Sequence, residues 1–340
     1  MNQQRRNILQ SGVAAGAAAL SGVAAAQTDA AGGRKPARVQ PLPVGMTFAT
    51  LATPRGMSLG LRDGDRILDV AAAEGRYRSG APTTTDDLIQ GRGDVAALPK
   101  LLARARSDAA AGGFFVAEAD ARFGPCVLAP EKIVCVGLNY KSHVAESGEK
   151  LPPVPILFNK FNSALNHHGG TIAVSSEKVA RKFDYEGELV IVMGKTARDV
   201  SEADALSYVF GYATGHDFSA RDTQLETSQW MAGKAGDGWG PVGPWLVTAD
   251  QVDPSNLDIE TRVNGEVRQS SNTSRMIFDC RTLVSFISQR MTLRPGDLIF
   301  TGTPEGVILG YPKEKQVWLK AGDTVTTRIE KLGTLEFKLT

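Results

Sequence analysis

Two glutamates inside a strand-like segment are the residues whose placement most directly suggests chemistry. The segment FDYEGELVIV, residues 183–192, is rich in aromatic and β-branched side chains and carries Glu186 and Glu188. Residues two apart in a strand share a face, so these carboxylates are expected side by side. Like charges that close repel, which predicts a cation, a shared proton or water beside them. An edge strand with both acids in solvent is the simpler alternative.

A third acid follows another apolar run. The segment GYATGHDFSARDTQ places Asp217 where a strand is expected to end. Three carboxylates are hard oxygen ligands, which favour Mg²⁺ or Mn²⁺ and also suit Ca²⁺, in preference to Zn²⁺ or Cu²⁺. The neighbouring His216 is expected either to support Asp217 from behind or to be an ordinary polar residue at a strand end.

A histidine and a glutamate in GLNYKSHVAESG form a candidate acid–base pair. His143 and Glu146 would share one face of a helical turn and could hydrogen-bond. A carboxylate that orients the imidazole makes it a candidate general base, although an exposed polar turn would give the same pattern. Lys234 lies in the glycine-rich loop MAGKAGDGWGPVGP, where it could present a cation to an anion or be a surface lysine.

The elements that must position these residues suggest two domains. Residues 40–125 alternate short apolar runs, turn signals and helical spacing, which predicts a small α/β domain with two or three strands in a small sheet. From 126 to 340, strand-like runs recur between Gly and Pro turns, with helical spacing at 202–209 and 274–288. Asn264-Gly265 is the strongest hairpin signal. The fold class is therefore α+β, mostly β.

The N-terminal segment has the features of an export signal. Residues 1–26 carry the Arg5-Arg6 pair, a mildly apolar stretch and a small-residue cleavage site at 24–26, which indicates a twin-arginine-type signal. Residues 27–39 are small and polar and predict a linker. We expect a periplasmic protein with no membrane span after signal removal; the alternative is an uncleaved tail.

Composition excludes several classes of function. The 340 residues carry a formal net charge of +1 and a pI near 7.7. The chain therefore lacks the excess of positive charge that is typical of nucleic-acid-binding proteins. The three cysteines, Cys126, Cys135 and Cys280, lack CxxC spacing and suggest neither a disulfide framework nor a zinc site. One disulfide stays open as an alternative.

An ordered set of motifs resembles the fumarylacetoacetate hydrolase family over about residues 130–339. The motifs are KIVCVGLNYKSHVAE, PILFNKFNSA, FDYEGELVIVMGKTARDV, GYATGHDFSARDTQ, MAGKAGDGWGPVGPWLVT, VNGEVRQ and LRPGDLIFTGTPEGV. The resemblance implies a mixed β-sheet roll or sandwich at residues 126–340. It also implies that Glu186, Glu188 and Asp217 bind Mg²⁺ or Mn²⁺, and that His143 and Glu146 activate water on a segment that often behaves as a lid in the family.

The resemblance extends to further residues of the site. Lys234 matches the lysine near the metal and the developing oxyanion. Gln224 and Thr303 match positions that contact substrate oxygens, and Lys160 matches a motif lysine that lines the site. The stretch NSALNHHGGTIAV departs from the usual shorter turn, so His167 and His168 are expected either to be ordinary loop residues or to reshape the substrate pocket.

The implied activity is metal-dependent hydrolysis of a carbon–carbon bond in an acylpyruvate or related β-diketo acid, a small-molecule substrate. A decarboxylase or isomerase of oxaloacetate-like or unsaturated keto acids on the same metal site is the first alternative. A non-catalytic keto-acid binding protein is the second. The resemblance also implies a homodimer.

Overall fold

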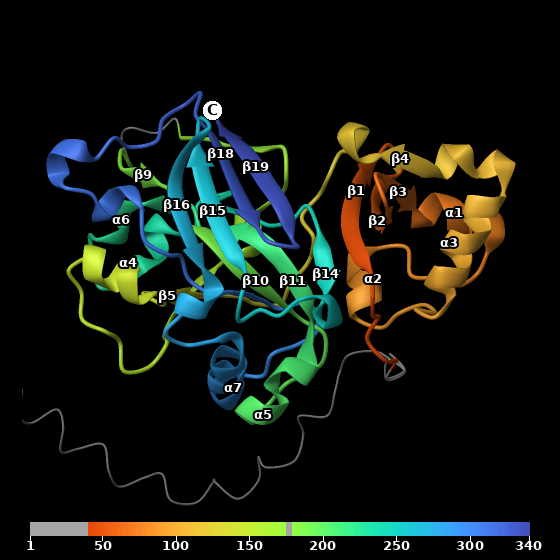
Figure 1. The fold of residues 1–340 in the computed structure, drawn as a ribbon, viewed down its shortest axis with the longest axis horizontal. Helices are drawn as coiled ribbons and strands as arrows, with labels where there is room; N and C mark the ends of the chain where they lie inside the picture. Colours follow the sequence, from red (N-terminus) through yellow and green to blue (C-terminus); the bar gives the residue numbers. More distant parts are fainter. Residues whose placement is uncertain (1–39, 175–178) are drawn as a thin grey trace, which may run out of the picture. The chain divides into compact units, whose positions relative to one another are not determined.

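The computed structural model describes residues 40–174 and 179–340, which belong to one compact unit (Figure 1). The predicted export signal and linker, residues 1–39, lie outside the described residues. Among the described helices, none is both long and apolar enough to cross a bilayer. The fold is mixed α+β and mostly sheet, which confirms the predicted fold class.

A ten-stranded mixed sheet is the central element. The strand order is β4 (Phe115–Ala117), β3 (Arg66–Asp69), β2 (Gly56–Asp63), β1 (Thr47–Thr53), β14 (Leu246–Thr248), β11 (Val209–His216), β10 (Gly187–Met193), β17 (Leu298–Phe300), β5 (Ile133–Gly137) and β6 (Ile156–Lys160). The central strands β10 and β11 are antiparallel, whereas β17 and β5 are parallel. Every residue of β10 and β11 is buried, as expected for strands covered on both faces.

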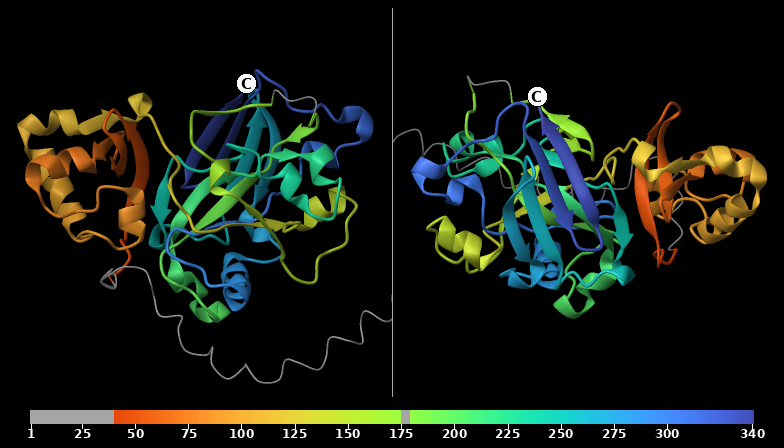
Figure 2. Two further views of the ribbon diagram at one scale, coloured as in Figure 1. Left: turned by 180° about the vertical axis from the view of Figure 1, so that it is seen from behind. Right: turned by 45° about the horizontal axis from the view of Figure 1, so that its top comes forward.

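A second, five-stranded sheet crosses the first, as two further views show (Figure 2). Its strand order is β16 (Glu266–Asn272), β15 (Asp258–Val263), β18 (Thr324–Ile329), β19 (Gly333–Leu339) and β8 (Gly170–Ile172). The predicted hairpin joins β15 to β16, with Asn264 at φ +52° and Gly265 at φ +84° as a two-residue turn of this type requires. Two short pairs complete the sheets: β12 (Ser219–Ala220) with β9 (Phe183–Asp184), and β13 (Gly240–Pro241) with β7 (Leu165–Asn166).

The helices are short and cover the sheets locally. They are α1 (Val70–Tyr77), α2 (Thr85–Ile89), α3 (Ala97–Ser107), α4 (Lys141–Glu146), α5 (Glu202–Ala205), α6 (Arg221–Gln224) and α7 (Cys280–Arg290). Side chains of α7 pack in the same core cluster as Leu189 and Ile191 of β10. The helix predicted over 274–288 begins only at Cys280, because the Asp279 side chain accepts a hydrogen bond from Thr282 N and caps the helix there.

The expectation of a separate small sheet within residues 40–125 is corrected. Three strands, β1 to β3, form where expected, but they do not make a separate small sheet. Strand β1 pairs with β14, with Thr47 opposite Val247, so the N-terminal strands continue the central sheet and leave no edge between them. All three cysteines are buried free thiols, so the disulfide left open by the sequence is absent from the structure. The domain boundary at 125/126 stays a prediction.

Candidate active site

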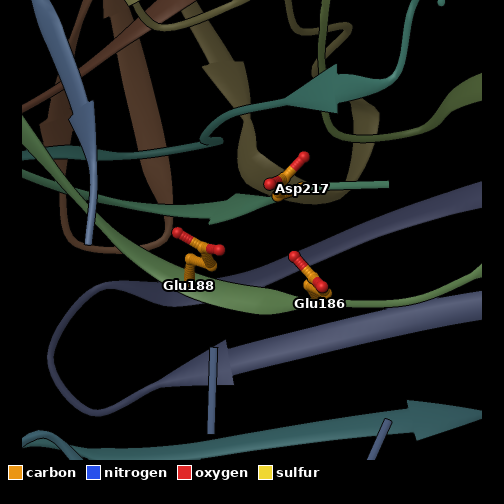
Figure 3. Close-up of side chains that lie close together, drawn as sticks. All are labelled: Glu186, Glu188 and Asp217. Carbon is orange, nitrogen blue, oxygen red and sulfur yellow. The ribbon is translucent and has the colours of Figure 1, made fainter. Parts of the chain in front are cut away.

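Three buried carboxylates meet where β10 begins and β11 ends. One ligand oxygen from each of Glu186, Glu188 and Asp217 lies within 4.8 Å of the others (Figure 3). Strand pairing produces this cluster: Gly187 is opposite His216, and Asp217 N donates to Glu186 O at 2.9 Å. The two glutamates therefore lie side by side, as their spacing predicts, but in a buried central strand and not in a solvated edge strand.

The glycine between the two glutamates is required by close packing. A Cβ atom on Gly187 would lie 2.2 Å from Thr261 Oγ1 of β15 and 2.8 Å from Thr327 Cγ2 of β18. Only glycine lets the backbone pass this close to the second sheet. Strand alternation then points Glu186 and Glu188 to the other side, toward Asp217.

Three buried cations neutralise two of the three acids. Lys234 Nζ lies 2.6 Å from Glu186 Oε2 and 3.1 Å from Asp217 Oδ2. Lys160 Nζ lies 2.6 Å from Asp217 Oδ1, and Arg221 Nη1 lies 2.7 Å from Glu186 Oε1. Burial alone would raise the pKa of Glu186, but Lys234 and Arg221 hold that pKa below its usual value.

Glu188 differs from the other two acids, because no lysine or arginine in the described part of the chain pairs with it. Among the described residues it forms no ion pair, and the hydrogen bond that it accepts comes from Gly302 N, at 2.7 Å to Oε2. Burial, and then the charges of Asp217 and Glu186, raise the pKa of Glu188 well above its usual value. A divalent cation would let all three carboxylates ionise together, and an all-carboxylate oxygen set suits Mg²⁺ or Mn²⁺. The residues therefore fit the predicted metal, without distinguishing which ion binds.

The predicted acid–base pair is also confirmed as a contact. His143 Nδ1 lies 2.8 Å from Glu146 Oε1 within helix α4, and Glu146 Oε2 accepts a hydrogen bond from Gly306 N at 2.9 Å. Because the carboxylate accepts, Nδ1 carries the proton and Nε2 is the basic atom. Gly310 packs so tightly on Glu146 that a Cβ there would lie 2.5 Å from the carboxyl carbon.

A cavity of about 250 Å³ joins the two groups. The predicted site residues in its wall are His143, Glu146, Glu186, Glu188, Gln224, Lys234 and Thr303. Phe158, Trp230 and Leu309 give the same cavity an apolar side. An oriented base, buried acids and a water-excluding wall therefore face one small space, which suits proton transfer on a small acid.

The two expected substrate contacts differ in their free hydrogen-bonding groups. Gln224 Oε1 accepts a hydrogen bond from Arg221 Nη1 at 2.9 Å, which leaves the Gln224 amide NH₂ for the cavity. Thr303 Oγ1 donates to Gly187 O at 3.0 Å and accepts from Gln269 Nε2 at 2.8 Å, so its proton is already used. Gln224 is thus the better donor to a substrate oxygen.

Lys160 lies elsewhere than the resemblance implies. Its ammonium is fully buried behind Asp217, also donates to Lys234 O, and is not in the cavity wall. We interpret Lys160 as a charge that holds Asp217 and the Lys234 loop, because its ammonium, unlike that of Lys234, does not line the cavity.

The remaining histidines do not shape the cavity. His168 packs edge-on against Phe123, with 5.5 Å between ring centroids, and neither it nor His167 is in the cavity wall, so the predicted reshaping of the pocket is wrong. His216 lies behind the acids: its Nε2 accepts from Glu186 N at 3.0 Å, and burial lowers its pKa to about 3. His216 therefore stays neutral and orients the backbone between the acids.

Sequence reasoning missed Arg221 and Asp184. Arg221 bridges Glu186 and Asp184, with Nε 2.8 Å from Asp184 Oδ2. Asp184 also accepts from Ile308 N and Leu309 N, which ties the cavity wall to the acid cluster. A charge count could have found them, because a buried acidic cluster requires buried cations nearby.

Comparisons with known proteins identify the family of this chain. Residues 132–340 match the model for the fumarylacetoacetate (FAA) hydrolase C-terminal domain. This chain belongs to the fumarylacetoacetate hydrolase family. It is 37% identical over 286 residues to the oxaloacetate tautomerase fahd2, mitochondrial, of Xenopus laevis, covering 83% of this chain and 85% of that protein. It is 46% identical over 222 residues to the fumarylacetoacetate hydrolase domain-containing protein 2 homolog of Dictyostelium discoideum, covering 61% and 71%.

Solved structures of the family resemble the whole described unit. The fumarylacetoacetate hydrolase of Exiguobacterium antarcticum has a TM-score of 0.71 at 31% identity and covers 87% of this chain and 99% of its own. The 5-carboxymethyl-2-hydroxymuconate delta-isomerase of Mycobacterium smegmatis has a TM-score of 0.66 at 33% identity and covers 87% and 98%. The family thus includes proteins named for hydrolysis, isomerisation and tautomerisation.

Proposed function

We propose that this chain is a metal-dependent tautomerase of oxaloacetate-like keto acids. The observation that carries the proposal is the oriented imidazole of His143 in the same small cavity as Glu186 and Glu188, with an oxygen of the buried Asp217 within 4.8 Å of theirs. The relative named an oxaloacetate tautomerase, which aligns over 83% of the chain, supports this activity over carbon–carbon hydrolysis. We therefore prefer the first alternative from the sequence, a decarboxylase or isomerase of keto acids, to the hydrolase that the sequence analysis placed first.

Tautomerisation moves one proton between carbon C3 and the oxygen on C2, and it consumes no water. A divalent ion held by Glu186, Glu188 and Asp217 would polarise the C2 oxygen as a Lewis acid and so acidify the C3 proton. His143 Nε2 takes the proton from C3 and returns it to the oxygen, or performs the reverse transfer. Glu146 keeps Nδ1 protonated and stabilises the imidazolium between the two transfers.

Two further donors hold the substrate. Lys234 Nζ uses two of its three protons on Glu186 and Asp217, so one remains for a substrate oxygen in the cavity that it lines. The Gln224 amide supplies a second donor. Both groups suit a carboxylate, and both are fixed by buried partners before the substrate arrives, which lowers the cost of ordering the complex.

The decisive experiment follows the decay of enol-oxaloacetate by ultraviolet absorbance with purified protein and Mg²⁺ or Mn²⁺. We expect acceleration by the wild type and a fall of about 10²- to 10⁴-fold for His143→Gln. His167→Gln is the matched control, because His167 lies outside the cavity wall. An unchanged rate for His143→Gln would refute the proposed base.

Hydrolysis is the second candidate, because the solved fumarylacetoacetate hydrolase covers 87% of this chain. The same base would then remove a proton from water, and the carbon–carbon bond of an acylpyruvate would break to give two acids. Product analysis by mass spectrometry separates the outcomes. Two acid fragments indicate the hydrolase, carbon dioxide from oxaloacetate indicates the decarboxylase, and unchanged mass with faster enol decay indicates the tautomerase.

Periplasmic location and homodimeric assembly are also proposed here, on the N-terminal pattern and the family resemblance. Cell fractionation with and without Arg5→Lys/Arg6→Lys tests export. Light scattering of the purified protein tests the dimer.

A further inference from the structure

The helix that carries His143 is too short to hold its own position. Helix α4 has six residues, and its N-cap residue Tyr140 makes no side-chain capping bond. Isolated helices of this length are unstable, so contacts with the rest of the protein must position it. Because the proposed base lies on this helix, those contacts decide where the imidazole is.

Two hydrogen bonds attach one face of α4 to a single loop. Ser142 Oγ donates to Glu305 Oε2 at 2.5 Å, and Glu146 Oε2 accepts from Gly306 N at 2.9 Å. Ser142 and Glu146 are four residues apart, so they lie on the same face one turn apart. Two attachments on one face, to consecutive loop residues, fix both the position and the rotation of the helix.

Glu305 is itself held by a different part of the chain. Arg275 Nη1 lies 3.2 Å from Glu305 Oε1, and Ser271 Oγ donates to Oε2 at 3.4 Å. Ser271 belongs to strand β16 and Arg275 to the following 3₁₀ turn, Thr273–Arg275. The Glu305 carboxylate therefore joins α4 to the five-stranded sheet.

We propose that Glu305 is a positioning residue that holds α4, and with it the His143 imidazole, against the carboxylate cluster. On the helix, the Ser142 hydroxyl donates the hydrogen bond that Glu305 accepts. Glu305 is absent from the wall of the cavity, so it acts through the helix and not on the substrate. The catalytic part of this inference rests on the proposed function; the attachment of the helix does not.

The experiment compares Glu305→Gln, Ser142→Ala and the double variant by hydrogen exchange and by turnover. Hydrogen bonds to charged groups of this kind support an increase of roughly 5- to 50-fold in the exchange of α4 amides, and a similar fall in kcat, with KM and bound metal unchanged. Both single changes act on the same bond, because Glu305→Gln removes the charge of the acceptor and Ser142→Ala removes the donor, so the double variant is expected to be no worse than Ser142→Ala.

Two controls make the result specific. Ser142→Thr keeps the hydroxyl and should restore wild-type exchange and turnover. Glu266→Gln removes an exposed carboxylate, paired with Arg268 on β16, and should change neither. Unchanged α4 exchange in both single variants, or additive losses in the double variant, would overturn the proposal. If exchange rises as expected but the wild type shows no turnover of keto acids, the attachment is supported and the proposed function fails.

Discussion

The two halves of the candidate site are built in opposite ways. The carboxylates lie on or beside fully buried central strands, and buried lysines and an arginine hold two of them. The proposed base lies on a six-residue helix attached by a few hydrogen bonds to one loop. The metal-binding half is thus rigid by packing, whereas the acid–base half is positioned by polar contacts and is the easier one to displace.

The metal-binding half can be broken at the acid that lacks a cation partner. Glu188→Gln keeps the shape but removes one anionic ligand, so metal affinity should fall at least about 10- to 100-fold, and turnover with it. Metal content and isothermal titration measure the affinity.

Glu188→Gln also tests the charge balance. Because burial and the neighbouring carboxylates disfavour the ionised form of Glu188, a neutral amide there should leave the metal-free variant at least as stable as the metal-free wild type. Metal should raise the Tm of the wild type, and it should raise the Tm of the variant much less. A metal-free variant of much lower stability would contradict this account of Glu188.

The acid–base half should fail without loss of metal. His143→Gln is expected to lower kcat by about 10²- to 10⁴-fold while metal content stays that of the wild type. This result would separate the two halves of the site, whereas loss of metal in this variant would show that they are coupled.

The packing of the rigid half can be tested at a glycine. Gly187→Ala would place a Cβ 2.2 Å from Thr261 Oγ1, so we expect a loss of about 1–3 kcal/mol in the free energy of unfolding, measured by denaturant titration. Gly75→Ala is the matched control: it lies in helix α1 with nothing within 4 Å, and should stabilise by about 0.5–1 kcal/mol. If Gly187→Ala and Gly75→Ala changed the free energy of unfolding by the same amount, the close contact between the two sheets at Gly187 would be contradicted.

The smallest effect is expected at the cysteines. Burial raises the pKa of Cys126 to about 12, and the pKa values of Cys135 and Cys280 are also raised by burial. At pH 8 the thiols are therefore protonated and unreactive. A thiol reagent should label none in the native protein and all three after denaturation. Rapid labelling of Cys135, on β5 of the central sheet, would show that the metal-binding half opens.

Local spacing made much of the site predictable. The pairs Glu186/Glu188 and His143/Glu146 follow from the geometry of one strand and one helical turn, and both are confirmed as neighbours in the structure. The Asn264-Gly265 hairpin was predictable for the same reason. The contact of β1 with β14 was not, because the paired residues Thr47 and Val247 lie far apart in the sequence.

The sequence by itself therefore determined the ligand types, the oriented base and the mostly-β fold class, because each depends on residues within a few positions of one another. Only the tertiary structure decided which acids receive cations, why Lys160 lies behind Asp217 and not in the cavity, and how α4 is attached through Glu305. These features join different segments of the chain, with separations from 17 residues between Asp217 and Lys234 to 163 residues between Ser142 and Glu305. Local propensity carries no information on such contacts, and packing and charge compensation select them.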